Sequence, residues 1–237
     1  MNSYIGDFPI APFVIVVDES ASMQENGGID LINRSLPEMV ATLTAIPEAR
    51  ERAAVGLMSF ANKAKIHRRI LSLDVGFDVP EFKADGRTSY AAPLKKLRSM
   101  IAEDLPKLGS RGHRPIVFFI TDGNPNVEEP PVWRAERANL LGEGFRLRPK
   151  LVTLGCGDVD KPTLEALASD PSLADWEKGP TAEALEAILD TVEGTITSFT
   201  GGKAEQIARS GNGLLARIYE FDQYDIGDDD VFEYQPA

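Results

Sequence analysis

The sequence predicts an α/β fold in which helices cover both faces of a doubly wound, mostly parallel central sheet. Residues 13–17 and 115–120 are apolar runs of the length and composition typical of strands buried on both faces. Segments with apolar residues at helical spacing alternate with such strands, which favours a three-layer α/β/α arrangement with right-handed crossovers. A link of only three residues, 61–63, joins two neighbouring strands, so we expect one antiparallel edge strand.

The first half of the chain supplies three of the expected strands. After residues 13–17, apolar side chains recur at steps of three and four over residues 29–43, which predicts a helix facing a core. Pro37 lies inside that helix and predicts a kink, because proline lacks the backbone N–H. Residues 55–60 form the second strand. Residues 65–73 form the third, where several basic side chains favour an edge position.

The second half continues the alternation. Apolar residues at helical spacing predict a helix over residues 94–105, with Pro93 in its first turn and Thr88 or Ser89 as its N-cap. The strand over residues 115–120 follows. The remaining expected elements are helices over residues 132–141, 162–168 and 181–199, a buried strand over 150–154 and a short last strand over 175–178.

Length and composition suggest one large domain with an extension. A chain of 237 residues buries enough surface to be stable without a disulfide or a structural metal. We place the domain at residues 1–200 and an acidic, aromatic-containing extension at residues 201–237, with Gly201-Gly202 as the boundary. From residue 218 onward there are seven acidic residues, five aromatic residues and no basic residue. A purely acidic tail would stay solvated, so the aromatics predict that part of it docks on the domain or on a partner.

Charge and patterning exclude several classes of protein. The 25 Lys and Arg residues against 37 Asp and Glu residues give a net charge of −12, which argues against binding nucleic acid or an anionic membrane. No apolar run approaches 18 residues, and residues 1–7 lack the features of a signal peptide. The single Cys156 rules out an intramolecular disulfide. We therefore expect a soluble, cytoplasmic protein.

Oxygen-bearing side chains follow or flank the sheet elements in three places. Asp18, Ser20 and Ser22 come directly after the first strand, Thr88 lies in the loop before a helix, and Asp122 ends the fourth strand. Taken singly, each has an ordinary explanation as a helix cap or a turn residue. Together they would meet where the strand order reverses, around one cation. Oxygen-only ligation suits a hard cation such as Mg²⁺.

The three segments also resemble a known metal site. Asp18-Glu19-Ser20-Ala21-Ser22-Met23, Gly86-Arg87-Thr88 and Ile120-Thr121-Asp122-Gly123 are similar to the three parts of the metal-ion-dependent adhesion site (MIDAS) of von Willebrand factor A (VWA) domains. The resemblance covers residues 10–199 in order and spacing. Within the family, the chain looks most like the bacterial, cytoplasmic, TerY-like proteins associated with tellurium resistance.

This resemblance implies a function. It implies Mg²⁺ or Mn²⁺ held directly by Ser20, Ser22 and Thr88, with Asp18 and Asp122 acting mainly through water. It further implies an open position on the metal for a carboxylate from a partner protein. The physics agrees, because neutral hydroxyl ligands leave a cation under-neutralised and attractive to an external anion.

The competing interpretation is a Mg²⁺-dependent phosphoryl-transfer enzyme of the haloacid-dehalogenase type, which also has an Asp after the first strand. That chemistry needs a second carboxylate two residues later, where this chain has Ser20. No phosphate-binding glycine motif supports a nucleotide site. His67 and His113 are expected on an edge strand and in a turn, and Cys156 in a buried glycine turn. The sequence therefore predicts a non-enzymatic, metal-dependent protein-binding module.

Overall fold

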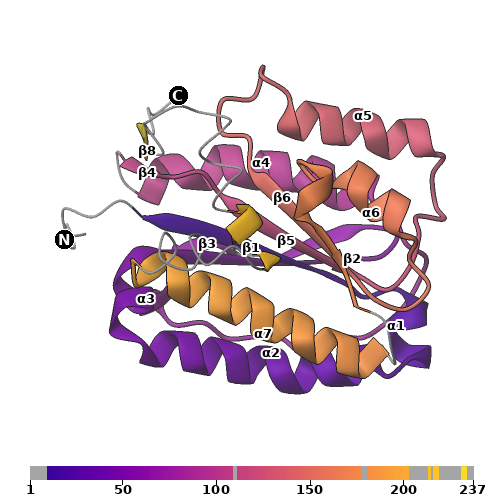
Figure 1. Ribbon diagram of the computed structural model, residues 1–237, viewed down its shortest axis with the longest axis horizontal. Coiled ribbons are helices and arrows are strands. Elements are labelled where there is room, and N and C mark those ends of the chain that lie inside the picture. The colour runs from indigo at the N-terminus through magenta and orange to yellow at the C-terminus, as the bar shows by residue number, and fades with distance from the viewer. Residues whose placement is uncertain are drawn as a thin grey trace.

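A six-stranded sheet runs through the centre of the molecule in the computed structural model (Figure 1), which describes residues 10–108, 111–177, 181–202, 213–214, 216–218 and 231–233. The strand order is β3-β2-β1-β5-β6-β7. All neighbours are parallel except β3, which is antiparallel to β2. The strands are β1 (Ala11–Asp18), β2 (Ala53–Phe60), β3 (Ala64–Ser72), β5 (Ile116–Thr121), β6 (Lys150–Gly155) and β7 (Ala174–Trp176).

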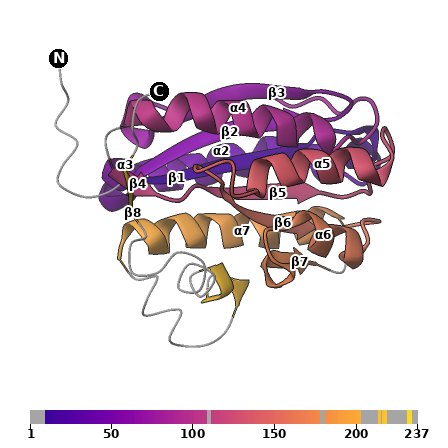
Figure 2. The same ribbon diagram turned by 90° about the horizontal axis from the view of Figure 1, so that it is seen from above.

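Helices cover both faces of this sheet, which confirms the predicted three-layer α/β/α fold. Figure 1 shows α2 and α7 on one face and α4 and α5 on the other, while Figure 2 shows α6 beside β6 and β7. The helices are α1 (Ala21–Glu25), α2 (Gly28–Ala45), α3 (Pro47–Arg52), α4 (Ala91–Leu108), α5 (Pro130–Leu141), α6 (Lys161–Leu167) and α7 (Thr181–Thr200). None of the helices in the described residues combines the length and the apolar composition needed to cross a lipid bilayer.

The central strand β1 explains why the fold has two cores. Every residue of β1 is buried, and successive side chains of a strand point to opposite faces. Phe13 and Ile15 therefore join the cluster under α2 and α7, while Val14 and Val16 join the cluster under α4 and α5. Full burial of such side chains stabilises the fold by roughly 1.5–3 kcal/mol each. The apolar run in the sequence is continuous because both faces are covered.

The edge strand β3 is stabilised by charges rather than by burial on both faces. Arg69 pairs with Glu103 and Asp104 of α4 at 2.6 and 2.7 Å. The buried Asp104 also accepts the backbone N–H of Ile70 at 3.1 Å. Charged side chains on an edge strand discourage pairing with other chains. The predicted antiparallel edge strand is confirmed.

Several short elements were not expected from the sequence. They include α1, α3 and a two-stranded ribbon in which β4 (Arg111–His113) pairs with β8 (Val231–Glu233). An isolated bridge between Ile10 and Gly112 joins the ribbon to the start of β1, so the ribbon lies at the amino end of the parallel strands. The long helix α2 spans Pro37, as predicted.

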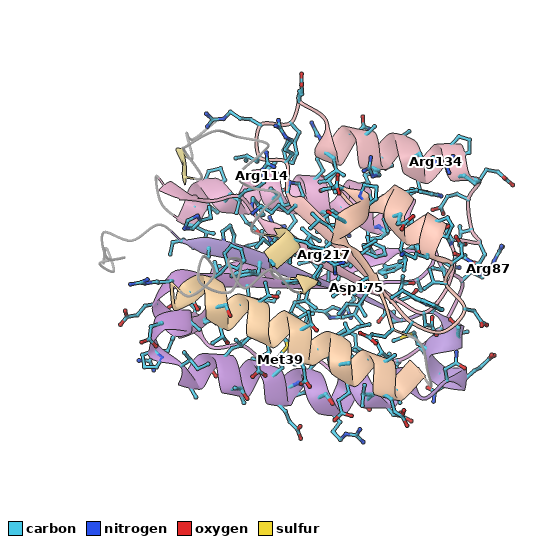
Figure 3. The ribbon with its side chains drawn as sticks, in the orientation of Figure 1. Met39, Arg87, Arg114, Arg134, Asp175 and Arg217 are labelled. Carbon is cyan, nitrogen blue, oxygen red and sulfur yellow. The ribbon has the colours of Figure 1, made fainter. Side chains whose placement is uncertain are left out.

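Part of the extension lies against the domain. Leu214 and Ile218 are buried in the same cluster as β1 and α7. Arg217 pairs with Asp175 of β7 at 2.9 Å, and Figure 3 shows the two side chains next to each other. The aromatic residues Tyr219, Phe221, Tyr224 and Tyr234, which predicted docking, lie outside the described residues.

Candidate metal centre

The side chains with the predicted metal-binding role lie at the carboxyl end of the sheet. β1 and β5 are parallel neighbours in which Val17 is paired with Ile120, so Asp18 and Asp122 leave the sheet at the same edge. Open α/β sheets place their ligand sites at this edge, where the strand order reverses. Thr88 reaches the same place from the segment that precedes α4.

Hydroxyl and carboxylate oxygens are close together at this edge. Ser20 Oγ and Ser22 Oγ lie 3.1 Å apart, and the Ser22 hydroxyl donates to Asp122 Oδ1 at 2.7 Å. A Cβ placed on Gly123 would lie 3.8 Å from both Ser22 Oγ and Thr88 Oγ1. The two hydroxyls therefore face one small space, and the structure brings Ser20, Ser22, Thr88 and Asp122 together.

Asp18 is hydrogen-bonded to residues on both sides of this group. Its Oδ1 accepts the backbone N–H of Ser20 at 2.8 Å, and its Oδ2 accepts the Thr121 hydroxyl at 2.6 Å. The Thr121 oxygen lies 3.1 Å from the carbonyl and 3.3 Å from the N–H of Gly123. Asp18 thereby connects the turn after β1 to the turn after β5. Sequence reasoning missed Thr121, whose only signal was its place directly before Asp122.

Burial makes the charged forms of the Asp18 and Asp122 carboxylates unfavourable. It raises the pKa of Asp18 to about 7, against the lowering effect of the hydrogen bonds from Thr121 and Ser20, and the nearby Asp122 raises it further. The pKa of Asp122 is also raised, chiefly by burial and also by the charge of Asp158. A cation between the two groups would favour their charged forms.

Thr88 is held by the loop that follows Asp122. Its backbone N–H donates to Asn126 Oδ1 at 3.0 Å. Its carbonyl accepts the N–H groups of Asn126 at 2.9 Å and Val127 at 3.3 Å. These contacts couple the position of the Thr88 hydroxyl to the turn that carries Asp122.

The cap of α4 also comes from that loop. Glu128 Oε1 accepts the N–H groups of Tyr90 and Ala91 at 2.8 Å each, where a carboxylate also complements the helix dipole. Of the two predicted caps, Ser89 Oγ accepts the N–H of Ala92 at 3.2 Å. The Thr88 hydroxyl instead lies on the side of Ser22 and Gly123, in the candidate metal centre. Glu128 was missed because a cap from a distant segment leaves no local sequence pattern.

The other residues considered from the sequence lie away from this space or are inert. Cys156 is fully buried, and burial together with the nearby carboxylates raises the pKa of its thiol to about 12. His67 lies on the edge strand, as expected, but it is only half exposed. Its Nε2 lies 2.7 Å from Ser59 Oγ, and its ring packs edge-on to Phe82 at 5.2 Å.

The donor set fits a hard divalent cation. In the described residues, no three His, Cys, Asp or Glu side chains are grouped as a metal cage would require, so hydroxyl oxygens make up most of the set. Ligand oxygens at right angles around Mg²⁺ lie about 3 Å apart, given Mg–O distances of about 2.1 Å. The separation of the Ser20 and Ser22 oxygens, 3.1 Å, matches that value, and the hydrogen bond to Asp122 at 2.7 Å orients the Ser22 hydroxyl.

Comparison with known proteins agrees with this geometry. A family model described as the von Willebrand factor type A domain matches residues 13–124, which include all five candidate residues. This part of the chain is therefore similar to a von Willebrand factor type A domain. No curated protein sequence shows significant similarity to it.

The VWA fold is similar to several solved structures. Proximal thread matrix protein 1 from the mussel byssus is 21% identical, with a TM-score of 0.56 over 78% of this chain and 47% of that one. The pilus adhesin SpaC from Lactobacillus rhamnosus GG is 14% identical (TM-score 0.62, 82% and 31%). A von Willebrand factor type A protein from Catenulispora acidiphila is 15% identical (TM-score 0.58, 80% and 43%). This chain thus covers less than half of each of these structures.

Proposed function

We propose that this VWA domain is a non-enzymatic protein-binding module that depends on Mg²⁺ or Mn²⁺. Ser20, Ser22 and Thr88 would bind the metal directly, and Asp18 and Asp122 would act mainly through water. A carboxylate of a partner protein would complete the site. The observation that carries the proposal is the run of oxygens from Ser20 through Ser22 to Asp122, with spacings of 3.1 and 2.7 Å.

The chemistry of the donors supports an open site. Hydroxyl ligands bring no charge, and the two carboxylates would act mainly through water. A divalent cation held in this way keeps enough positive charge to attract a carboxylate from a partner. Related structures support divalent metal binding in general, since one structure of the mussel byssus protein is described as having a zinc-occupied MIDAS motif. Mg²⁺ or Mn²⁺ in this chain is part of our proposal and follows from the oxygen-only donor set.

The burial of Asp18 argues against the phosphoryl-transfer alternative. A nucleophilic aspartate must be reached by the phosphoryl group that it attacks. Asp18 is fully buried, and both of its oxygens accept hydrogen bonds. The position two residues later, where such enzymes place a general acid, holds Ser20. We therefore expect no phosphatase activity towards p-nitrophenyl phosphate.

A cytoplasmic location and a role in a tellurium-resistance or stress-response system rest on the resemblance to TerY-like proteins. The structurally similar proteins include a pilus adhesin and a byssus matrix protein, and their settings are properties of those proteins.

Calorimetric titration with Mg²⁺ and Mn²⁺ tests the metal site. We expect binding to the wild-type protein and at least a tenfold loss of affinity in the double variant Ser22→Ala/Thr88→Ala, which removes two of the proposed direct ligands. Ser99→Ala is a matched control, because Ser99 is an exposed hydroxyl on α4 whose nearest acceptor is 3.5 Å away. Equal affinity in the double variant and the control would contradict the proposed ligand set.

A further inference from the structure

One side of the rim of the candidate metal centre carries two exposed cations, alongside the exposed Asp85. Two exposed basic residues, Lys63 and Arg87, belong to neighbouring segments there: the tip of the β2–β3 hairpin and the segment that carries Thr88. The two segments are in contact, since Ser89 N–H donates to the Ala61 carbonyl at 3.1 Å and Arg87 N–H donates to Asn62 Oδ1. The two cations therefore lie on the same flank of the site.

The opposite side of the rim is acidic. Asp158 and Asp160 are exposed in the loop after β6. The backbone N–H of Asp158 donates to the carbonyl of Asp122 at 3.0 Å, which places this loop directly beside the metal-binding turn. A partner that carries more than one carboxylate would be repelled from this side and attracted to the side of Lys63 and Arg87.

The backbone at Arg87 is fixed while its side chain is available. Gly86 has a φ of +86°, and a Cβ at this position would lie 2.9 Å from Asn62 Oδ1, so only glycine fits the turn. The Gly86 carbonyl accepts the N–H of Ala21 at 3.1 Å. In the part of the chain that the structure describes, the Arg87 guanidinium makes no ion pair or hydrogen bond. Figure 3 shows its side chain at the right-hand periphery of the molecule.

We propose that Arg87, assisted by Lys63, selects partner segments that carry a second acidic residue close to the one that binds the metal. This inference rests on the proposed function and specifies the partner's chemistry: an acidic protein segment with at least two neighbouring carboxylates. The net charge of −12 makes the selection useful, because the molecule as a whole repels such a segment. A local cationic flank offsets that repulsion and orients the segment across the site.

The expected change in peptide affinity is small, because the ion pair between Arg87 and the second carboxylate of the partner would be exposed. An exposed ion pair contributes up to about 1 kcal/mol and weakens as salt screens it. A contribution of about 0.4–1 kcal/mol corresponds to a two- to fivefold change in affinity. Rim charges also act mainly on association rate and salt dependence.

Two capped synthetic peptides test the proposal, with the sequences Gly-Gly-Asp-Gly-Gly-Gly and Gly-Gly-Asp-Gly-Glu-Gly. Binding is followed by NMR titration with Mg²⁺ and with EDTA, at low and high salt, for wild type, Arg87→Gln and Lys63→Gln/Arg87→Gln. Arg34→Gln is the control, because it removes the same charge from an exposed position on α2. We expect the wild type and the control to prefer the two-acid peptide two- to fivefold at low salt. The preference should disappear in both Arg87 variants and at high salt.

The outcomes separate this inference from the proposed function. A two-acid preference that survives in both Arg87 variants would overturn the role of Arg87, while Mg²⁺-dependent binding of the one-acid peptide would still support the proposed function. Absence of Mg²⁺-dependent binding of either peptide to the wild type would overturn the proposed function and the selection built on it.

Discussion

Asp18 shows how a single residue can be costly to the metal-free protein and still be placed where the site requires it. The side chain is fully buried, and burial raises its pKa to about 7. One pKa unit corresponds to about 1.4 kcal/mol, so the charged form is held at the expense of stability. A cation beside it would offset this cost. Residues with such perturbed ionisation mark functional sites more often than structural ones.

The variant Asp18→Asn tests this cost. The asparagine oxygen can accept the N–H of Ser20, and its amide can donate to the Thr121 oxygen, because the Thr121 hydroxyl can instead donate to the Gly123 carbonyl 3.1 Å away. We expect the variant to be more stable than wild type by about 1 kcal/mol or more in EDTA, and to lose Mg²⁺ binding. Thermal unfolding with and without Mg²⁺ measures both effects.

A control for that measurement is Asp190→Asn, which removes the same charge from an exposed position on α7. The control should change stability little and keep the stabilisation by Mg²⁺. If Asp18→Asn were less stable than wild type in EDTA, the view of Asp18 as a costly buried charge would be wrong.

At the scale of elements, the long ones could be predicted, as could the short helix α6 and the short strand β7, whereas the elements that the sequence did not predict are all short. Strands β1 and β5 and helices α2, α4 and α7 carry enough apolar residues for a period to show. The ribbon of β4 and β8 has three residues in each strand and joins segments more than 100 residues apart. A pairing of that kind leaves no periodic signal in the sequence, and the same holds for the six-residue helix α3.

The candidate site likewise contains residues that could be predicted from the sequence and residues that could not. Asp18, Ser20, Ser22, Thr88 and Asp122 could be named because they follow or flank recognisable elements. Thr121, Asn126 and Glu128 could not. Thr121 donates to the Asp18 carboxylate, and Asn126 and Glu128 accept backbone N–H groups of another loop. Their contribution depends on how the loops after β1, before α4 and after β5 come together. That arrangement is a property of the folded sheet edge and not of any single segment.

Glu128 provides a prediction at this scale. Replacing Glu128 by Ala removes the acceptor for two N–H groups at the start of α4, which should cost about 1 kcal/mol of stability. It should also weaken Mg²⁺ binding, because Thr88 lies two residues before the capped Tyr90. Glu128→Gln keeps one oxygen as an acceptor and should recover much of both losses. Chemical denaturation and calorimetric Mg²⁺ titration measure the two effects.

The neighbouring Glu129 gives the matched control. It stands at the N-cap of α5, and its side chain makes no capping hydrogen bond. Glu129→Ala should therefore leave Mg²⁺ affinity unchanged. Equal Mg²⁺ affinity in Glu128→Ala and Glu129→Ala would show that the cap stabilises α4 without positioning Thr88.

At the scale of the whole molecule, the candidate metal centre and the β4–β8 ribbon lie at opposite ends of the parallel strands. Asp18, Ser20, Ser22 and Asp122 of the candidate metal centre follow the carboxyl ends of β1 and β5, whereas the ribbon adjoins Ile10 at the start of β1. His113, paired with Val231 of β8, precedes Asp122 by nine residues, which span roughly 30 Å in extended chain. The acidic residues at positions 225–230 lie outside the described residues.

Chain geometry limits what those carboxylates can reach. Asp225 is six residues from Val231, and six residues extend at most about 22 Å. While β8 stays paired with β4, we expect this length of chain to keep a carboxylate at positions 225–230 away from the metal centre of its own molecule. Removal of residues 219–237 should leave the affinity for Mg²⁺ and for an acidic peptide unchanged. It should lower the free energy of unfolding by about 1–3 kcal/mol through loss of the ribbon's hydrogen bonds. Denaturation and peptide titration of the truncated protein check both expectations, and an increase in peptide affinity on truncation would mean that the tail competes for the metal after all.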